Sequence, residues 1–126
     1  MFSLDDLLDY ECRASERYRR ALSIVVAGGH GGEGSFLLRA GDLVRGSDKV
    51  IGLDGTVAIV MGETPIEGVL CAFERFATRY GNDTALQCGA ASFPQDAHDA
   101  KNLQHIALRR YEAAKTQGGN ALVWRD

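Results

Sequence analysis

The glycine-rich stretch at residues 29–34 is the first place where this sequence could do chemistry. It reads GHGGEG, follows an apolar run of strand length, and precedes residues 35–44 (SFLLRAGDLV), which favour a short helix. A strand, a loop spelled G-x-G-x-x-G and a helix form the context in which backbone N–H groups bind a pyrophosphate at a helix N-terminus. The spelling alone is a weak signal, so the surrounding elements must decide whether the loop binds a dinucleotide.

The other reactive side chains do not form a recognisable constellation. His30, His98 and His105 lack the spacing of metal ligands. Ser35 is placed to cap the short helix, and no base is paired with it that would make it a nucleophile. The sequence therefore predicts no catalytic residue, no metal site and no cofactor outside the glycine-rich stretch.

Composition limits the class of protein. The chain has 126 residues, 45% hydrophobic and 25% charged, and a formal net charge of -3, which predicts one globular domain spanning 1–126 with no attraction to nucleic acid or an anionic membrane. The acidic start and the lack of a long apolar run predict a cytoplasmic protein. Three cysteines without C-x-x-C spacing predict reduced, mostly buried thiols: Cys12, Cys71 and Cys88.

Hydrophobic periodicity and turn residues predict the elements that must position any site. The apolar positions in residues 66–80 fall on one helical face, and Asp54-Gly55 has the composition of a tight hairpin turn. Helices are expected at 3–20, 35–44, 66–80 and 96–115, and strands at 21–27, 49–53, 56–61, 84–93 and 121–124.

The order of these elements predicts an α+β fold. After the first helix the chain reads βαββαβ, which favours a ferredoxin-like palm, an antiparallel sheet covered on one face by helices, with an N-terminal helix and an extra C-terminal helix and strand. A dinucleotide-binding fold would need a parallel second strand, whereas a two-residue turn makes its two strands antiparallel. The glycine-rich stretch is therefore interpreted as a chance match to the G-x-G-x-x-G motif.

Two segments resemble GGDEF domains. Residues 91–122 resemble the C-terminal third of that family, including the helix end YEAAKTQGGN at 111–120, and residues 11–27 (ECRASERYRRALSIVVA) are similar to its first helix and strand. The match also includes ERF at 74–76, so that it spans most of the chain. The resemblance implies the palm fold of a bacterial signalling domain whose active members join two GTP molecules into cyclic di-GMP across a dimer, with Mg²⁺ held by carboxylates.

The sequence departs from that family wherever it would hold metal. The first-strand aspartate falls where Val26, Ala27 and Gly28 stand, and the hairpin signature, Gly-Gly-Asp/Glu-Glu-Phe in the family, reads LDGTV at 53–57, one residue shorter. The family helix after the first strand is missing, so the glycine-rich loop is expected to bridge a deletion. These departures predict a degenerate GGDEF-like domain without cyclase activity.

A second site of the family is retained in the sequence. Many GGDEF domains bind their product at R-x-x-D, five residues ahead of the hairpin signature, with a further arginine on the next helix. Arg45-Gly46-Ser47-Asp48 stands five residues ahead of the Asp54-Gly55 turn, and Arg75 occupies the place of the helix arginine. The resemblance thus implies a cyclic di-GMP site at Arg45, Asp48 and Arg75. The alternative is an exposed ion pair at a strand end, worth under about 1 kcal/mol.

The function predicted from the sequence is a non-catalytic receptor or adaptor in cyclic di-GMP signalling. Because no sensor domain precedes the first helix in this sequence, regulation is expected from a partner protein or a bound nucleotide. One alternative is a protein–protein interaction or dimerisation module, including a homodimer through the N-terminal helix, without a nucleotide ligand. A third hypothesis is an enzyme that binds a nucleotide through the G-x-G-x-x-G loop.

Overall fold

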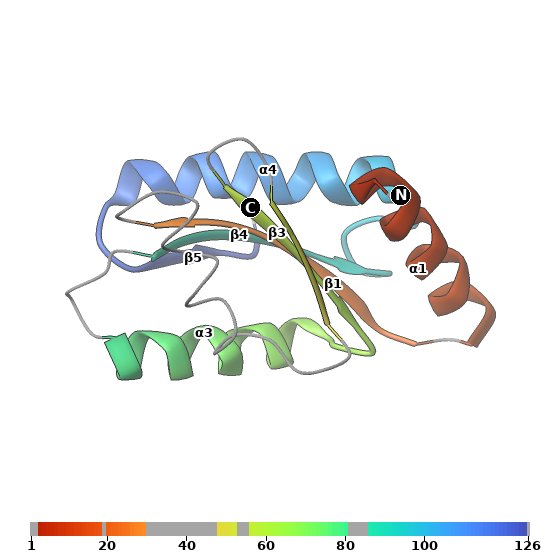
Figure 1. Ribbon diagram of the computed structural model, residues 1–126, viewed down its shortest axis with the longest axis horizontal. Coiled ribbons are helices and arrows are strands. Elements are labelled where there is room, and N and C mark those ends of the chain that lie inside the picture. Colours follow the sequence, from red (N-terminus) through yellow and green to blue (C-terminus); the bar gives the residue numbers. More distant parts are fainter. Residues whose placement is uncertain (1–2, 19, 30–47, 53–55, 81–85, 126) are drawn as a thin grey trace.

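The computed structural model describes residues 3–18, 20–29, 48–52, 56–80 and 86–125. Within these ranges the chain forms one five-stranded sheet with helices on both faces (Figure 1). The elements are α1 (Leu4–Tyr18), β1 (Leu22–Gly29), β2 (Lys49–Gly52), β3 (Val57–Gly62), α3 (Ile66–Tyr80), β4 (Leu86–Phe93), α4 (Ala100–Gln117) and β5 (Ala121–Val123).

The sheet has the order β2-β3-β1-β4-β5, with β1 at its centre. β1 runs antiparallel to both of its neighbours, so that Val25 lies opposite Ile59 on β3 and Ala90 on β4. β2 and β3 are antiparallel, as the predicted hairpin requires, while the turn residues 53–55 lie outside the described part of the chain. β5 pairs with β4 in parallel, which makes the sheet mixed rather than wholly antiparallel.

Both faces of the sheet are buried. Successive side chains of β1 point to opposite faces, and helices cover each of them. Val25 and Ala27 belong to the core beneath α3, whereas Ile24 and Val26 belong to the core beneath α1 and α4. The predicted cover of one face by the helices of the βαββαβ unit agrees with α3, the one helix of that unit within the described residues. The helices α1 and α4, which lie outside the unit, cover the second face (Figure 1).

The helix α4 begins four residues later than its predicted start at Asp96. Asp99 is its N-cap, with a side-chain oxygen that accepts from the Asn102 N–H at 2.8 Å. Asp96 lies in the preceding turn, where its two carboxylate oxygens accept from the Ser92 N–H at 2.8 Å and from Arg110 Nη2 at 2.9 Å. The side-chain bonds of Asp96 therefore hold the turn and leave Asp99 to start the helix.

Helix α4 lies directly on β4 because position 89 is a glycine. A Cβ atom at Gly89 would overlap the backbone of α4 at Ala107 and Tyr111. No helix in the described ranges is long and apolar enough to cross a membrane. The predicted helix at 35–44 and the proposed replacement of a family helix by the glycine-rich loop fall within residues 30–47, outside the described residues.

Candidate functional site

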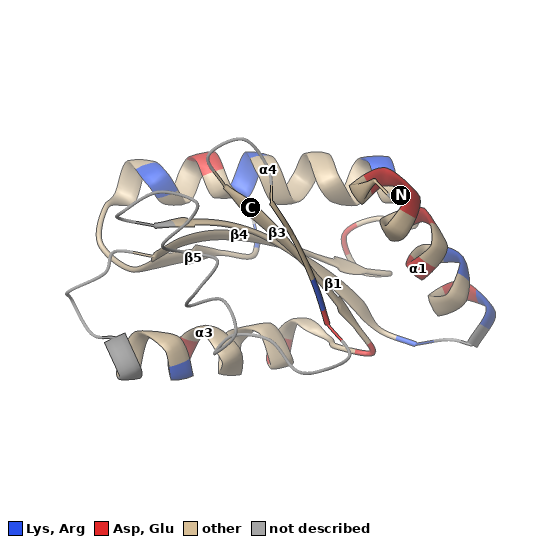
Figure 2. Ribbon diagram, in the orientation of Figure 1, with Lys and Arg blue, Asp and Glu red and all other residues tan. Residues whose placement is uncertain are grey.

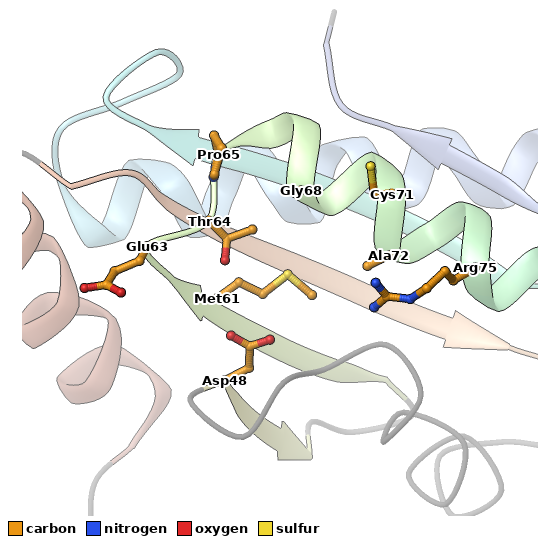
Figure 3. Close-up of a pocket in the computed structure, with 9 residues that line it drawn as sticks. All are labelled: Asp48, Met61, Glu63, Thr64, Pro65, Gly68, Cys71, Ala72 and Arg75. Carbon is orange, nitrogen blue, oxygen red and sulfur yellow. The ribbon is translucent and has the colours of Figure 1, made fainter.

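A cavity of about 250 Å³ lies between the β2–β3 edge of the sheet and α3 (Figure 3). One wall is formed by the start of β2 and the end of β3, the other by the first three turns of α3. The residues that line it are Asp48, Met61, Glu63, Thr64, Pro65, Gly68, Cys71, Ala72 and Arg75. The cavity therefore contains two of the three residues that the sequence assigned to a ligand site.

Asp48 stands directly before β2, and only 9% of its surface is exposed. Its carboxylate points toward the space below Met61 and α3 (Figure 3). Buried carboxylates are uncommon because an ionised group loses its hydration, so they usually have a structural or a ligand-binding role. The alternative from the sequence was an exposed ion pair at a strand end. Asp48 does not fit this alternative because it is buried.

Arg75 reaches the cavity from the opposite wall. It is an exposed residue of α3, and its guanidinium group points into the space between the helix and the strands (Figure 3). Gly68, Cys71, Ala72 and Arg75 follow the spacing i, i+3, i+4 and i+7, which places all four on one side of the helix. This helical spacing is visible in the sequence and could have identified the α3 wall of the cavity, of which only Arg75 was predicted.

The turn from β3 into α3 is held by a buried chain of hydrogen bonds. Ser23 Oγ on β1 donates to the Thr64 carbonyl at 2.7 Å, and it also shares a 2.7 Å hydrogen bond with Ser92 Oγ on β4. Thr64 Oγ1 donates to the Gly62 carbonyl at 3.0 Å. Glu63 adopts a positive φ of 56° at this turn. This wall of the cavity is therefore anchored to β1 and, through Ser92, to β4.

Glu63 does not contribute its charge to the cavity. Its side chain points away from the other lining residues (Figure 3), and its Oε1 lies 2.6 Å from Arg20 Nη1 at the surface. A more open hollow of about 410 Å³ continues along α3 past Cys71 and Arg75 to Glu74 and Thr78. A ligand could therefore place one group between Asp48 and Arg75 and extend the rest along the outside of the helix.

A larger hollow, of about 570 Å³, lies between α1 and α4, but its charge does not suit a phosphate ligand. Its lining contains four aspartates together with one lysine and one histidine: Asp5, Asp6, Asp9, Asp99, Lys101 and His105. An excess of carboxylates repels a phosphate group. Size alone therefore does not identify the site, and the Asp48–Arg75 cavity is the better candidate.

The three positions at which the resemblance would place a metal-binding aspartate lie in a closed part of the sheet. Val26 and Ala27 are buried in the two cores, and a Cβ atom at Gly28 would overlap the hydroxyl group of Tyr111 from α4. Burial raises the pKa of the Tyr111 hydroxyl. The contact of Tyr111 with Gly28 depends on how α4 lies across β4 and β1.

The remaining candidate residues are scattered or lie outside the described ranges. His98 packs edge-to-face on Phe93 with 5.5 Å between ring centroids, and His105 lines the acidic hollow. In the part of the chain that the structure describes, no three His, Cys, Asp or Glu side chains are grouped so as to hold a metal ion. The third predicted ligand residue, Arg45, as well as His30, Ser35, Asp54 and the G-x-G-x-x-G loop, fall in the ranges that are not described.

Two of the three cysteines are buried, as predicted, and all three are free thiols. Cys12 lies on the inward face of α1 and Cys88 lies on β4, whereas Cys71 is exposed at the cavity. Burial and nearby carboxylates raise the pKa of Cys12 to about 11, and burial raises the pKa of Cys88 further. Cys71 is therefore the accessible thiol of the described residues.

Comparison with known proteins identifies the fold. No protein-family model and no curated protein matches the sequence. Among solved structures, the isolated GGDEF domain of YfiN from Pseudomonas aeruginosa superimposes with a TM-score of 0.84 at 18% identity, over 99% of this chain and 94% of that one. The active GGEEF domain of a diguanylate cyclase from Vibrio cholerae gives 0.81 at 17% identity, over 98% and 95%.

A third structure, described as a new mode of interaction between a microbial GGDEF domain and cyclic di-GMP, gives a TM-score of 0.72 at 14% identity over 97% of this chain and 94% of that one. The chain therefore has the fold of GGDEF domains over nearly its whole length, as the resemblance predicted. At these identities the comparison establishes the fold alone.

Proposed function

We propose that this chain is a non-catalytic GGDEF-like receptor that binds cyclic di-GMP at the cavity between Asp48 and Arg75, with Arg45 as a third contributor. The observation that carries the proposal is the cavity itself. A buried carboxylate and an arginine, 27 positions apart in the sequence, approach it from opposite walls. They are the same two residues that the R-x-x-D pattern and the following helix suggested.

The chemistry of the two side chains suits a guanine base. An ionised carboxylate only accepts hydrogen bonds, and guanine offers it the N1–H and the 2-amino group as donors. A guanidinium group can donate to O6 and N7 of guanine, or lie flat on a purine and attract a phosphate. Adenine has an acceptor at N1, which a carboxylate would repel. The pair therefore favours guanine over adenine.

The size of the cavity limits how the ligand binds. Pockets that enclose drug-sized ligands have volumes of roughly 300–1,000 Å³, whereas this cavity has about 250 Å³. We infer that one guanine base enters the cavity and that the phosphates and the second half of the dinucleotide follow the open hollow beside Cys71 and Arg75. Binding of this kind leaves part of the ligand exposed.

The non-catalytic part of the proposal is supported by the first strand. Its three candidate metal positions are Val26, Ala27 and Gly28, none of which has a side-chain oxygen. Tyr111 occupies the space that a carboxylate side chain at position 28 would need. Two-metal phosphoryl transfer depends on carboxylates that hold the ions between the attacking and leaving oxygens. We therefore expect no cyclisation of GTP by this chain.

Titration calorimetry with cyclic di-GMP tests the receptor. The unmodified chain should bind, and Arg75→Ala, Asp48→Asn and Arg45→Ala should each weaken binding about tenfold to a hundredfold, because each removes a charge-assisted hydrogen bond worth about 1.5–3 kcal/mol. Arg109→Ala is the matched control, since Arg109 is an exposed arginine of α4 on the other face of the sheet. Cyclic di-AMP should bind far more weakly than cyclic di-GMP.

Two results would count against the proposal. If a folded chain gives no heat with cyclic di-GMP, the receptor hypothesis is excluded, and a dimerisation module becomes the better hypothesis. Release of pyrophosphate from GTP, dependent on Mg²⁺ and on the amount of protein, would remove the non-catalytic assignment. The two assays are independent, so that either part of the proposal can fail alone.

A further inference from the structure

The outward face of α1 carries a symmetric arrangement of charges. The inward face of the helix consists of residues spaced by four, four and three positions: Leu4, Leu8, Cys12 and Ser15, all buried. Directly opposite, at spacings of four, three and four, are Asp6, Tyr10, Arg13 and Arg17, all exposed. In Figure 2 the ribbon of α1 is red, for acidic residues, at its N-terminal end, and blue segments, for basic residues, alternate with red ones toward its C-terminal end.

An aromatic residue stands near the middle of this face. Tyr10 is 65% exposed, more than any other large hydrophobic residue in the described part of the chain. With Arg13, Ala14 and Arg17 it lines a hollow of about 230 Å³ on the outer side of the helix. An exposed aromatic ring beside arginines is typical of the centre of an interaction surface rather than of a solvated helix face.

We propose that this face of α1 binds the same face of a second copy of the chain, with the two helices antiparallel. The two-fold axis crosses the helix at the level midway between positions 11 and 12. Positions 6 and 17 are equidistant from that axis, as are positions 10 and 13. Asp6 of one copy then meets the partner's Arg17, and Tyr10 meets the partner's Arg13. Two-fold symmetry repeats each contact, which gives two ion pairs at the ends and two cation–π contacts at the centre.

The charge pattern selects this orientation. In a parallel pair, equal positions would face each other, so that Asp6 would meet Asp6 and Arg17 would meet Arg17, which is repulsive in both cases. Because the face carries both signs of charge, a uniformly acidic or basic partner would find repulsion at one end. The antiparallel copy matches opposite charges at both ends.

Arg13 is already oriented along this face. Its Nη2 lies 3.1 Å from Asp9 Oδ2 one turn earlier, with both side chains more than half exposed. The bond fixes an edge of the guanidinium group and leaves its plane available to lie against the partner's Tyr10. Arginine is the cation that most often packs on an aromatic ring in this manner.

The expected association is weak. A helix of 15 residues is about 22 Å long, and two such helices in contact bury less than the roughly 1,200 Å² of standard stable interfaces. Exposed ion pairs add little and are screened by salt. The dimer should therefore form reversibly at high protein concentration and dissociate as ionic strength rises.

Sedimentation over a micromolar to millimolar range of the full chain tests the proposal. Asp6→Arg and Arg17→Asp should each raise the dissociation constant on the order of tenfold, because each replaces two attractive pairs with two repulsive ones. The double variant Asp6→Arg/Arg17→Asp should restore dimerisation, and an equal mixture of the two single variants should form mixed dimers. Glu16→Arg, the same charge change on an exposed residue beside this face, is the matched control and should have no effect.

Asp6 also caps its own helix, and the design separates this role. Its backbone N–H donates to Ser3 Oγ at 3.2 Å, and its carboxylate accepts from the Ser3 N–H at 3.4 Å. The double variant, like Asp6→Arg alone, lacks the carboxylate that accepts from the Ser3 N–H, so that recovery of the dimer can only come from restored pairing. Circular dichroism checks that each variant keeps its helix content.

Disulfide trapping then tests the register. In a Cys71→Ser background, a chain carrying Asp6→Cys should form a mixed disulfide with a chain carrying Arg17→Cys, and two copies of the Arg17→Cys chain should not link to each other. A monomer at every concentration would overturn the proposal, as would a dimer that ignores both charge reversals. Because α1 and the Asp48–Arg75 cavity lie on opposite faces of the sheet (Figure 1), Arg75→Ala should leave dimerisation unchanged.

Discussion

The hydroxyl group of Tyr111 lies against the backbone of Gly28, where β1 passes beneath α4. A Cβ atom at position 28 would overlap this hydroxyl, and the ring carbons that follow it are 3.1 and 3.3 Å away. The end of the central strand is therefore fitted to a residue without a side chain.

Gly28→Ala should destabilise the chain by about 1–3 kcal/mol, because the new methyl group overpacks a closed contact. Tyr111→Phe removes the atom with the worst overlap, so Gly28→Ala should cost clearly less in that background. Urea denaturation of the two single variants and the double variant gives the coupling free energy. Strictly additive effects would show that Tyr111 does not restrict position 28.

Arg110→Ala should destabilise the chain by about 2–4 kcal/mol, because it leaves a partly buried carboxylate and a buried carbonyl without this donor. Arg110 is 5% exposed and donates to the Ala90 carbonyl at 2.8 Å and to Asp96 Oδ1 at 2.9 Å. Thermal and urea denaturation would measure the loss. The neighbouring Arg109→Ala, at an exposed position of the same helix, should change stability by less than about 0.5 kcal/mol.

Part of the acid sensitivity of the fold should depend on Asp99. Hydrogen bonds from the backbone and the side chain of Asn102 lower the pKa of this N-cap carboxyl below its ordinary 3.8. A lowered pKa means that Asp99 stabilises the folded state above its unfolded pKa, and that this stabilisation disappears as the pH falls through the folded pKa.

Denaturation measured from about pH 6 to about pH 2 would test this linkage. Asp99→Asn keeps a capping side chain that does not titrate, so its stability should fall less with acid than that of the unmodified chain. Asp99→Ala should be less stable at neutral pH because it lacks the cap. An unchanged pH profile in Asp99→Asn would show that the carboxyl does not contribute to the acid response.

Alkylation of the native chain should modify Cys71 first. Near pH 8, a Cys12 thiol with a pKa of about 11 is ionised in only about one molecule in a thousand, and the thiolate is the reactive form. Peptide mass spectrometry after brief treatment with iodoacetamide would locate the label. If cyclic di-GMP occupies the cavity, it should slow labelling at Cys71, and this protection should be absent in Arg75→Ala.

Most of the elements could be predicted from local sequence patterns. The bounds of α3 at Ile66–Tyr80 agree with the prediction because its apolar residues keep one helical period and a Gly-Asn pair follows it. The β2–β3 hairpin was predicted from a turn dipeptide between two apolar runs, which is also a local signal. Such patterns do not show which face of the sheet a helix covers, so the sequence did not assign α1 and α4 to a face.

The site was predicted only in part, because its walls meet through long-range contacts. Asp48 and Arg75 could be selected from motif spacing, but Thr64 and Met61 could not. Their place at the cavity depends on the register of β3 against β1 and on the bond from Ser23 to the Thr64 carbonyl, which joins residues 41 positions apart. No short window of sequence contains that information.

The hydrogen bond from Ser23 Oγ to the Thr64 carbonyl also fixes one wall of the cavity. Ser23 on β1 and Ser92 on β4 are fully or almost fully buried, and through them the Thr64 wall is fixed before anything binds. A base that enters does not have to order that wall, so the conformational entropy usually lost on closing a pocket is already lost in folding. Discrimination between bases should therefore depend on how closely each base fits this preformed shape, and it should change little with temperature.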